Sequence, residues 1–428
     1  MNVPAPPSSP PPTAGRVPEG ARLALAAVAA AALVLVALVA VTGRRFGTSD
    51  AEAATGGLTS SAEGTASPES NDDGDETTAG TPVDGCPEGT IIEVCDAVAF
   101  IEEFKGGRPF KTFPTVNFID EAAFDEFLLA DFADAEEDLR NSGDSLRSLG
   151  LIEPDVDLAD ALRTTLELGV VGAYNTETGE LNVNGTEVNL YTQMVMVHEL
   201  THAWDDQYFE LSRPEYDLSD DEIGSGFLHV VEGSATLVEQ AWRASLTPAE
   251  QSELDALELG AIAPEDLDLL FTVPMFVLQL QISPYTDGAS FVQAIYDAGG
   301  IDAVDALFDS PPTTTEQVFH LDAYDSGEPA LPVAEDSPSG DAFDRGVLGE
   351  VTFNLWFGPE VGDGWGGDRY VSWRSAGQVC TAVTVTGDTE ADTAEFGTAF
   401  DDWAAAAPAG SKRTVTESDG IVTATGCL

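Results

Sequence analysis

The sequence predicts an α+β fold with a mainly helical core, a small β-hairpin or sheet lining a cleft, and a small C-terminal α+β region. Two long stretches have the apolar content expected of helices, Thr192–Tyr208 and Asp220–Ala244. Between Val170 and Val183 the pattern changes to two short strands around the loop Asn175–Gly179, which is typical of a hairpin. Near the end of the chain, short strand-like runs precede an amphipathic stretch, Thr389–Ala406.

The chain begins with three segments that are not expected to join this core. Residues 1–22 are rich in Pro and Ser and predict a disordered cytoplasmic tail. Residues 23–42 carry an unbroken apolar run that is long enough to cross a bilayer, so we predict a transmembrane helix or signal anchor. Residues 46–85 are acidic and poor in large apolar side chains, which predicts a disordered linker. This order predicts a single-pass protein of the cell membrane.

The globular part is expected to begin at residue 86 and to divide near residue 344. Residues 86–344 would form the domain that carries the chemistry, and residues 345–428 an α+β region packed on it or belonging to it. Besides the hairpin and the two long helices, the first part is expected to contain one strand and three helical stretches: Phe110–Phe118, Glu121–Leu149, Asp157–Leu168 and Asp287–Ala298. In the second part the expected strands are Arg369–Trp373 and Cys380–Val385.

The charge of the chain restricts its partners. Its 76 acidic residues oppose 17 basic ones, for a formal net charge of -59. Such a surface repels phosphate groups, so we exclude nucleic acid as a partner. The acidity fits either a high-salt habitat or a biased genome, and neither one defines an activity.

The four cysteines form an early pair and a late pair. None has the CxxC spacing of a zinc or redox site. All four lie in turn-rich or terminal segments, so we favour the disulfides Cys86–Cys95 and Cys380–Cys427 over four buried free thiols. Disulfides indicate an oxidising compartment, which predicts that the globular part lies outside the cytoplasm.

The most informative motif is His198-Glu199-Leu200-Thr201-His202. On a helix the two histidines share one face, where their imidazoles suit Zn²⁺. Glu199 would then lie beside a water molecule that it could deprotonate. The alternative is a chance match on a surface helix, but the apolar run Met194–Val197 before the motif indicates a buried helix.

A hydrolytic zinc site also needs a third protein ligand and an open position for water. The metzincin pattern is excluded, because Asp205 and Tyr208 stand where it requires glycine and histidine. The candidate ligand is Glu232, followed by Gly233, which has no side chain to hold a neighbouring helix away. His229 on the same helix is the rival ligand; otherwise it is a packed or solvated residue.

The HExxH motif followed by Glu232-Gly233-Ser234-Ala235 resembles the gluzincin zinc peptidases. The resemblance implies a zincin-like core in which His198, His202 and Glu232 hold Zn²⁺. The segment His198–Gln207 is similar to the HELxHAxxDQ helix of a little-characterised, membrane-anchored bacterial group of gluzincins. The resemblance spans about Gly172–Tyr324, roughly a third of the chain.

Peptide hydrolysis further needs a hydrogen-bond donor for the oxyanion of the tetrahedral intermediate. The segment Tyr285-Thr286-Asp287-Gly288 precedes an apolar stretch and resembles the segment that carries the transition-state tyrosine in several gluzincins. Tyr285 is therefore the first candidate, against the alternative of a core tyrosine at a helix start. His320, which follows the loop at Pro311-Pro312, is the second candidate.

The chain departs from two gluzincin branches. Thr236 stands where thermolysin-like enzymes have an aspartate that orients a histidine, so Glu239 or Asp206 is expected to accept that N–H instead. The Gly-x-Met-Glu-Asn motif of the aminopeptidase branch does not occur, which favours an endopeptidase.

Together these features predict a membrane-anchored, extracytoplasmic zinc peptidase that acts on peptides or proteins. Glu199 would serve as general base, with Tyr285 or His320 as oxyanion donor. A noncatalytic surface protein that keeps a zincin fold for binding or scaffolding is the competing hypothesis. A hydrolase of non-peptide amides is a third.

Overall fold

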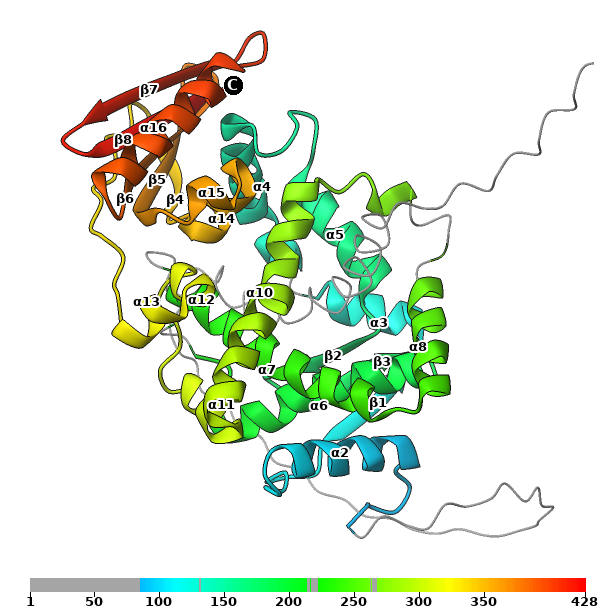
Figure 1. Cartoon of the computed structure of the whole chain (residues 1–428). Helices are drawn as coiled ribbons and strands as arrows, with labels where there is room; N and C mark the ends of the chain where they lie inside the picture. The colour runs from blue at the N-terminus through cyan, green and yellow to red at the C-terminus, as the bar shows by residue number, and fades with distance from the viewer. Residues whose placement is uncertain (1–84, 131, 214–215, 217–221, 262, 264–267) are drawn as a thin grey trace, which may run out of the picture.

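Helices form most of the molecule, and two small sheets complete it (Figure 1). The computed structural model describes residues 85–130, 132–213, 216, 222–261, 263 and 268–428. A five-stranded sheet lies at one end of the molecule and α2 (Ile92–Phe104) at the opposite end. The predicted α+β fold is therefore confirmed.

Three long helices lie between these ends: α6 (Leu190–Phe209), α7 (Ile223–Ser245) and α10 (Met275–Gly299). The first two agree closely with the predicted stretches. The close packing of α7 against α10 depends on Gly233, because a Cβ atom there would overlap the carbonyl oxygen of Gly288. Gly233 was predicted to let a neighbouring helix approach, and α10 is that helix.

The third long helix differs from the prediction, because it begins before Asp287 and includes Pro284. A proline inside a helix removes one backbone hydrogen bond, and here apolar packing on both sides of it offsets that cost. Val277 and Leu278 are buried before the proline, and Phe291 and Val292 are buried after it. Tyr285 consequently lies inside a helix and not at a helix start.

The smaller sheet contains the predicted hairpin. Its order is β1-β3-β2, with β2 (Gly172–Asn175) antiparallel to β3 (Glu180–Asn184) and β1 (Thr115–Ile119) parallel to β3. The first strand begins later than predicted, because the backbone N–H and C=O of Thr112 pair with the Gln207 side chain. The Gln207 side chain thus makes the two hydrogen bonds that a neighbouring strand would otherwise make with Thr112.

The other helices enclose this centre. The predicted stretch Glu121–Leu149 is two helices, α3 (Glu121–Leu128) and α4 (Phe132–Leu149), and the next predicted stretch is α5 (Leu158–Gly169). Neither α2 nor α8 (Pro248–Gly260) was predicted, and the shorter helices that follow were not predicted either. Shorter helices follow along the chain: α11 (Ile301–Leu307), α12 (Glu316–Phe319), α13 (Leu321–Ser326), α14 (Gly349–Phe357) and α15 (Pro359–Gly362).

The C-terminal region is an antiparallel sheet with α16 (Glu390–Ala405) packed on it. Phe353, Phe396 and Phe400 are fully buried between the sheet and the helices. Thr389 caps α16 through a reciprocal hydrogen-bond pair with Asp392, so the amphipathic stretch begins where it was predicted. The strand order is β4-β5-β6-β8-β7, with bounds Asp341–Gly346 (β4), Trp365–Ser375 (β5), Gln378–Gly387 (β6), Lys412–Ser418 (β7) and Ile421–Cys427 (β8).

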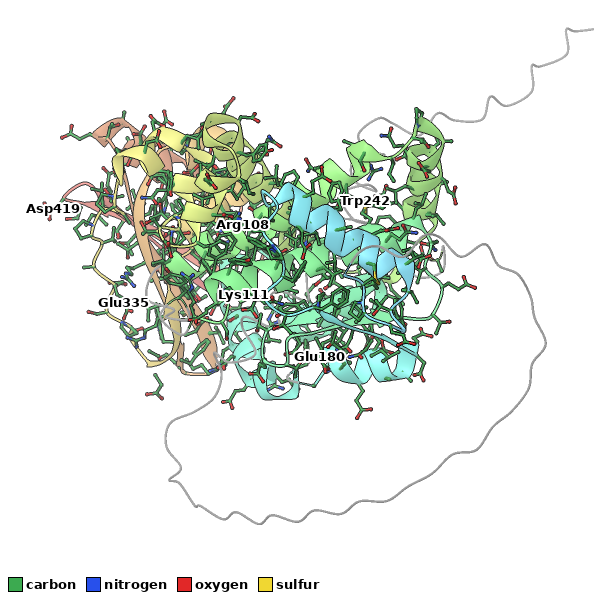
Figure 2. The ribbon with its side chains drawn as sticks, turned by 90° about the horizontal axis from the view of Figure 1, so that it is seen from below. Arg108, Lys111, Glu180, Trp242, Glu335 and Asp419 are labelled. Carbon is green, nitrogen blue, oxygen red and sulfur yellow. A yellow bond between two sulfur atoms is a disulfide. The ribbon has the colours of Figure 1, made fainter. Side chains whose placement is uncertain are left out.

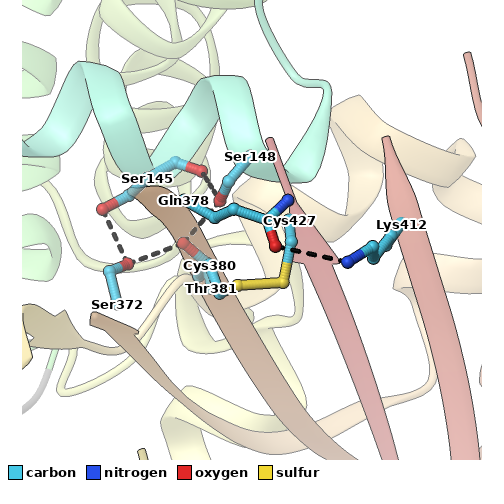
Figure 3. The surroundings of a disulfide bond; sticks show 8 residues. All are labelled: Ser145, Ser148, Ser372, Gln378, Cys380, Thr381, Lys412 and Cys427. Carbon is cyan, nitrogen blue, oxygen red and sulfur yellow. Dashed lines mark hydrogen bonds between the residues drawn. A yellow bond between two sulfur atoms is a disulfide. The ribbon is translucent and has the colours of Figure 1, made fainter. Parts of the chain in front are cut away.

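Both predicted disulfides are present, Cys86–Cys95 and Cys380–Cys427. The second joins β6 to β8 next to α4, as Figure 3 shows. Beside it, buried hydroxyl groups connect α4 to the sheet: Ser148 donates to Thr381 at 2.6 Å, and Ser372 donates to Ser145 at 2.7 Å.

The predicted membrane anchor is not supported. Within the described ranges, no helix is both long enough and apolar enough to cross a membrane. The apolar run 23–42 lies outside the described residues, as do the predicted tail 1–22 and most of the linker 46–85. We therefore withdraw the membrane as a partner, together with the single-pass cell-membrane location.

The acidic surface is visible in Figure 2, where carboxylate oxygens project around the outline of the molecule. The few basic side chains include Arg108 and Lys111, which lie over the rings of Trp204 and Tyr208 respectively. These two cations stabilise the end of α6 through contacts with aromatic faces.

Candidate metal centre

The helices α6 and α7 bring His198, His202 and Glu232 together. Both Nε2 atoms lie 3.3 Å from Glu232 Oε2. All three side chains are buried. Within the described chain these residues form a group of metal-ligand type whose ligand atoms lie within 4.8 Å of one another. The three could therefore bind a metal ion.

Opposite charges balance inside this histidine–glutamate cluster. Burial alone would raise the pKa of the Glu232 carboxyl, but the two imidazoles beside it outweigh burial and lower the pKa to about 2. Burial alone would lower the pKa of His198, but its contacts with Glu232 and Glu239 raise it to about 10. Glu232 and His198 thus stabilise each other's charged form. Glu232 Oε1 and His202 Nδ1 are buried without a hydrogen-bond partner.

A second carboxylate orients the first histidine. Glu239, two turns along α7 from Glu232, lies 3.0 Å from His198 Nδ1. Asp206, the other expected partner, instead accepts from the Tyr174 hydroxyl and the Leu211 N–H. A carboxylate on Nδ1 fixes the ring so that Nε2 faces the centre of the cluster.

Glu199 lies at the junction of α6 and the hairpin. Its Oε2 accepts a 2.9 Å hydrogen bond from the Tyr174 backbone N–H. Burial raises the pKa of this carboxyl, while His202 and His198 act in the opposite direction. The predicted proximity of the hairpin to the motif is therefore present.

Tyr285 is the predicted oxyanion donor that lies beside the cluster. Its ring stacks on that of His198, with centroids 5.8 Å apart. Burial and then the Glu232 carboxylate raise the pKa of the phenol well above its ordinary value. The hydroxyl consequently keeps its proton and can act as a donor.

His229, the rival ligand, faces away from the cluster. Its Nδ1 lies 2.7 Å from the Ser225 carbonyl oxygen and its Nε2 lies 3.1 Å from Ser283 Oγ. Burial lowers its pKa. His229 is therefore the packed helix residue that the alternative interpretation described.

His320 belongs to a different part of the molecule. Its Nε2 lies 3.1 Å from Glu350 Oε1, and these two residues group with Asp363. A neighbouring group contains only carboxylates: Glu316, Glu328 and Asp388. The structure thus brings Tyr285, but not His320, to the histidine–glutamate cluster.

The sequence interpretation missed a buried ion pair behind the cluster. Lys105 Nζ lies 2.6 Å from Asp205 Oδ1 and donates to Ser234 Oγ at 3.0 Å, and both Lys105 and Asp205 are fully buried. This contact ties the end of α2 to α6 and α7, three residues beyond His202 and two beyond Glu232. The rarity of lysine, three in the chain, was the available signal.

No model of a known protein family matches this chain, and no curated protein or solved structure matches it either. Arguments about function therefore depend on the geometry of the site.

Proposed function

We propose that this protein is a zinc-dependent peptidase of the gluzincin type. The observation that carries the proposal is the convergence of His198 Nε2, His202 Nε2 and Glu232 Oε2 in a buried site, with Glu199 beside them. Two imidazoles and one carboxylate form a ligand set used for hydrolytic zinc.

The spacing of the ligand atoms favours zinc. A tetrahedral ion with bonds of about 2.0–2.1 Å separates its ligands by about 3.3–3.4 Å. Each imidazole nitrogen lies 3.3 Å from Glu232 Oε2. The nitrogen-rich ligand set also argues against Ca²⁺ and Mg²⁺, which prefer oxygen ligands.

The surrounding side chains have the chemistry that hydrolysis requires. When bound, zinc would supply a Lewis acid that polarises the substrate carbonyl and lowers the pKa of water. Glu199 would accept a proton from the attacking water and pass it to the leaving amine. The Tyr285 hydroxyl would donate to the oxyanion as it forms, and Glu239 would hold His198 in place.

The hairpin supports a peptide as substrate. Among the described strands β2 pairs with β3 alone, and its Tyr174 N–H points the other way, to Glu199. An extended peptide can add to such an edge through main-chain hydrogen bonds and so place a peptide bond near Glu199. Because no amino-terminus-binding motif was found, we propose an endopeptidase.

The decisive test is Glu199→Gln in the zinc-loaded protein, with a casein-like substrate. We expect hydrolysis to fall by about 10²-fold or more while bound zinc stays at the wild-type level. Glu187→Gln, an exposed substitution before the same helix, is the matched control and is expected to change neither quantity. Equal cleavage by both variants would refute the role of Glu199. Stoichiometric zinc without cleavage in the wild type would instead favour a noncatalytic binding protein.

A further inference from the structure

A cavity of about 400 Å³ lies where α4, α5, α7 and α10 meet the C-terminal region. None of the three cluster ligands lines it. Most of its wall is apolar, including Leu146, Leu162, Phe276, Val277, Pro284 and Val351. Its volume falls within the range of about 300–1,000 Å³ that small-molecule sites occupy in proteins.

One polar side chain in this wall has no partner. Gln281 is 5% exposed, and neither its Nε2 nor its Oε1 makes a hydrogen bond in the described structure. Leaving such a buried amide unpaired costs about 1–3 kcal/mol for each group. Gln281 lies on α10, one turn before Tyr285, so the cavity begins close to the histidine–glutamate cluster without including it.

The imidazole and the carboxyl of the wall are already hydrogen-bonded. His229 bonds to the Ser225 carbonyl oxygen and to Ser283 Oγ. The carboxyl of Asp344 accepts from Ser145 at 2.6 Å and from the Tyr370 hydroxyl at 3.1 Å. The buried amide of Gln281 therefore keeps both its donor and its acceptor for a ligand.

The charges around the cavity restrict that ligand. Its lining residues include no lysine or arginine, so nothing there would balance an anion, and Asp344 would repel one. A cation would lose its hydration among apolar walls while the Asp344 oxygens are already bonded. A neutral ligand avoids both costs.

We propose that this cavity binds a neutral, elongated aliphatic molecule that carries an amide. The amide oxygen of the ligand accepts from Gln281 Nε2 and its N–H donates to Gln281 Oε1, so two reciprocal hydrogen bonds form. An ester satisfies only one of these atoms, and a carboxylate cannot donate. The aliphatic chain fills the apolar remainder of the cavity.

Calorimetric titration of the zinc-loaded Glu199→Gln protein with decanamide tests the proposal, because this background prevents hydrolysis. We expect saturable binding of one decanamide per chain, and weaker binding of methyl decanoate and of decanoate. Adding Gln281→Leu is expected to weaken decanamide binding on the order of tenfold. Gln293→Leu makes the same change on α10 outside the cavity and is the control.

Absence of saturable decanamide binding would overturn the proposal, as would decanoate binding as tightly as decanamide. Equal affinities in the Gln281→Leu and Gln293→Leu variants would also overturn it. If the Gln281→Leu variant fails to fold, a comparison of two ligands still tests the proposal, because it needs no substitution at Gln281. N,N-dimethyldecanamide lacks both N–H donors and is expected to bind on the order of tenfold more weakly than decanamide. Equal affinity for the two amides would contradict the reciprocal hydrogen bonds.

Discussion

Two groups of histidine and carboxylate side chains lie in different parts of this molecule, and their charges are balanced in opposite ways. The histidine–glutamate cluster places two imidazoles around Glu232 on long buried helices. The second group, which we call the acidic group, has His320 as its one basic member. Its carboxylates come from short helices and loops: Glu316, Glu328, Glu350, Asp363 and Asp388.

The difference appears in two carboxyls that solvent does not reach. Glu232 and Glu350 are both fully buried. Two imidazoles lower the pKa of Glu232 to about 2 against the effect of burial, whereas burial raises that of Glu350 to about 7 despite His320. Burial alone therefore does not make a metal ligand. The ratio of imidazoles to carboxylates decides whether the carboxylate is held in its charged form.

The largest expected effect on metal affinity and hydrolysis comes from replacing the central carboxyl of the histidine–glutamate cluster by an amide, compared with the same replacement in the acidic group. Glu232→Gln removes a ligand, so we expect metal affinity and hydrolysis to fall by more than about 100-fold. Glu350→Gln is expected to leave both unchanged. Metal content and cleavage rate are measured on both variants. A larger loss in Glu350→Gln than in Glu232→Gln would contradict the assignment of the metal site to the histidine–glutamate cluster.

Removing the proposed oxyanion donor should cost rate but not metal. For Tyr285→Phe we expect kcat to fall by about 10²–10³-fold, with KM and metal content close to wild type. Tyr296→Phe lies on the same helix, against Phe104, and serves as control. If His320→Ala lowers kcat and Tyr285→Phe does not, the donor lies in the acidic group and our assignment is wrong.

A smaller effect is expected from the carboxylate that positions His198. Glu239→Gln weakens the contact at Nδ1 and should lower metal affinity or activity by about 10–100-fold. Glu253→Gln, exposed on α8, is the matched control. Competition with a chelator measures the affinity. Identical affinities in the two variants would show that Glu239 does not orient the ligand.

The smallest effect concerns stability near the acidic group. Burial raises the pKa of Glu222 from 4.5 to about 8, although Thr315 donates to it, and Asp368 and Glu350 add to the increase. A raised folded-state pKa favours the protonated form, so this stabilisation is complete below about pH 4.5 and is lost as the pH rises through about 8.

Urea unfolding at about pH 5 and about pH 6.5 measures the first part of this loss. Between the two, the wild type is expected to lose about 1–2 kcal/mol more than Glu222→Gln. Parallel pH dependences in the two proteins would rule out a raised pKa for Glu222.

The sequence predicted the elements whose local pattern agrees with their packing. The apolar run before His198 gave a buried helix, and the loop Asn175–Gly179 gave a hairpin. Gly233 gave the close approach of α7 and α10. The paired cysteines were also predicted correctly, because each pair closes a turn-rich or terminal segment.

The remaining features depend on contacts between distant residues. The predicted helix began only at Asp287, but apolar packing on both sides of Pro284 keeps α10 continuous and brings Tyr285 to His198. The pairing of Lys105 with Asp205 joins residues separated by 100 positions, which no local pattern reports. Glu232 and His229 lie on one helix, so the orientation of α7 about its own axis decides which of the two side chains faces the histidines. The sequence alone does not specify that orientation.

The most direct test is the zinc content of the wild-type protein after extensive dialysis against metal-free buffer. The convergence of His198, His202 and Glu232 predicts one zinc ion retained per chain, and its loss in Glu232→Gln. A wild-type protein that retains no stoichiometric zinc would contradict the account.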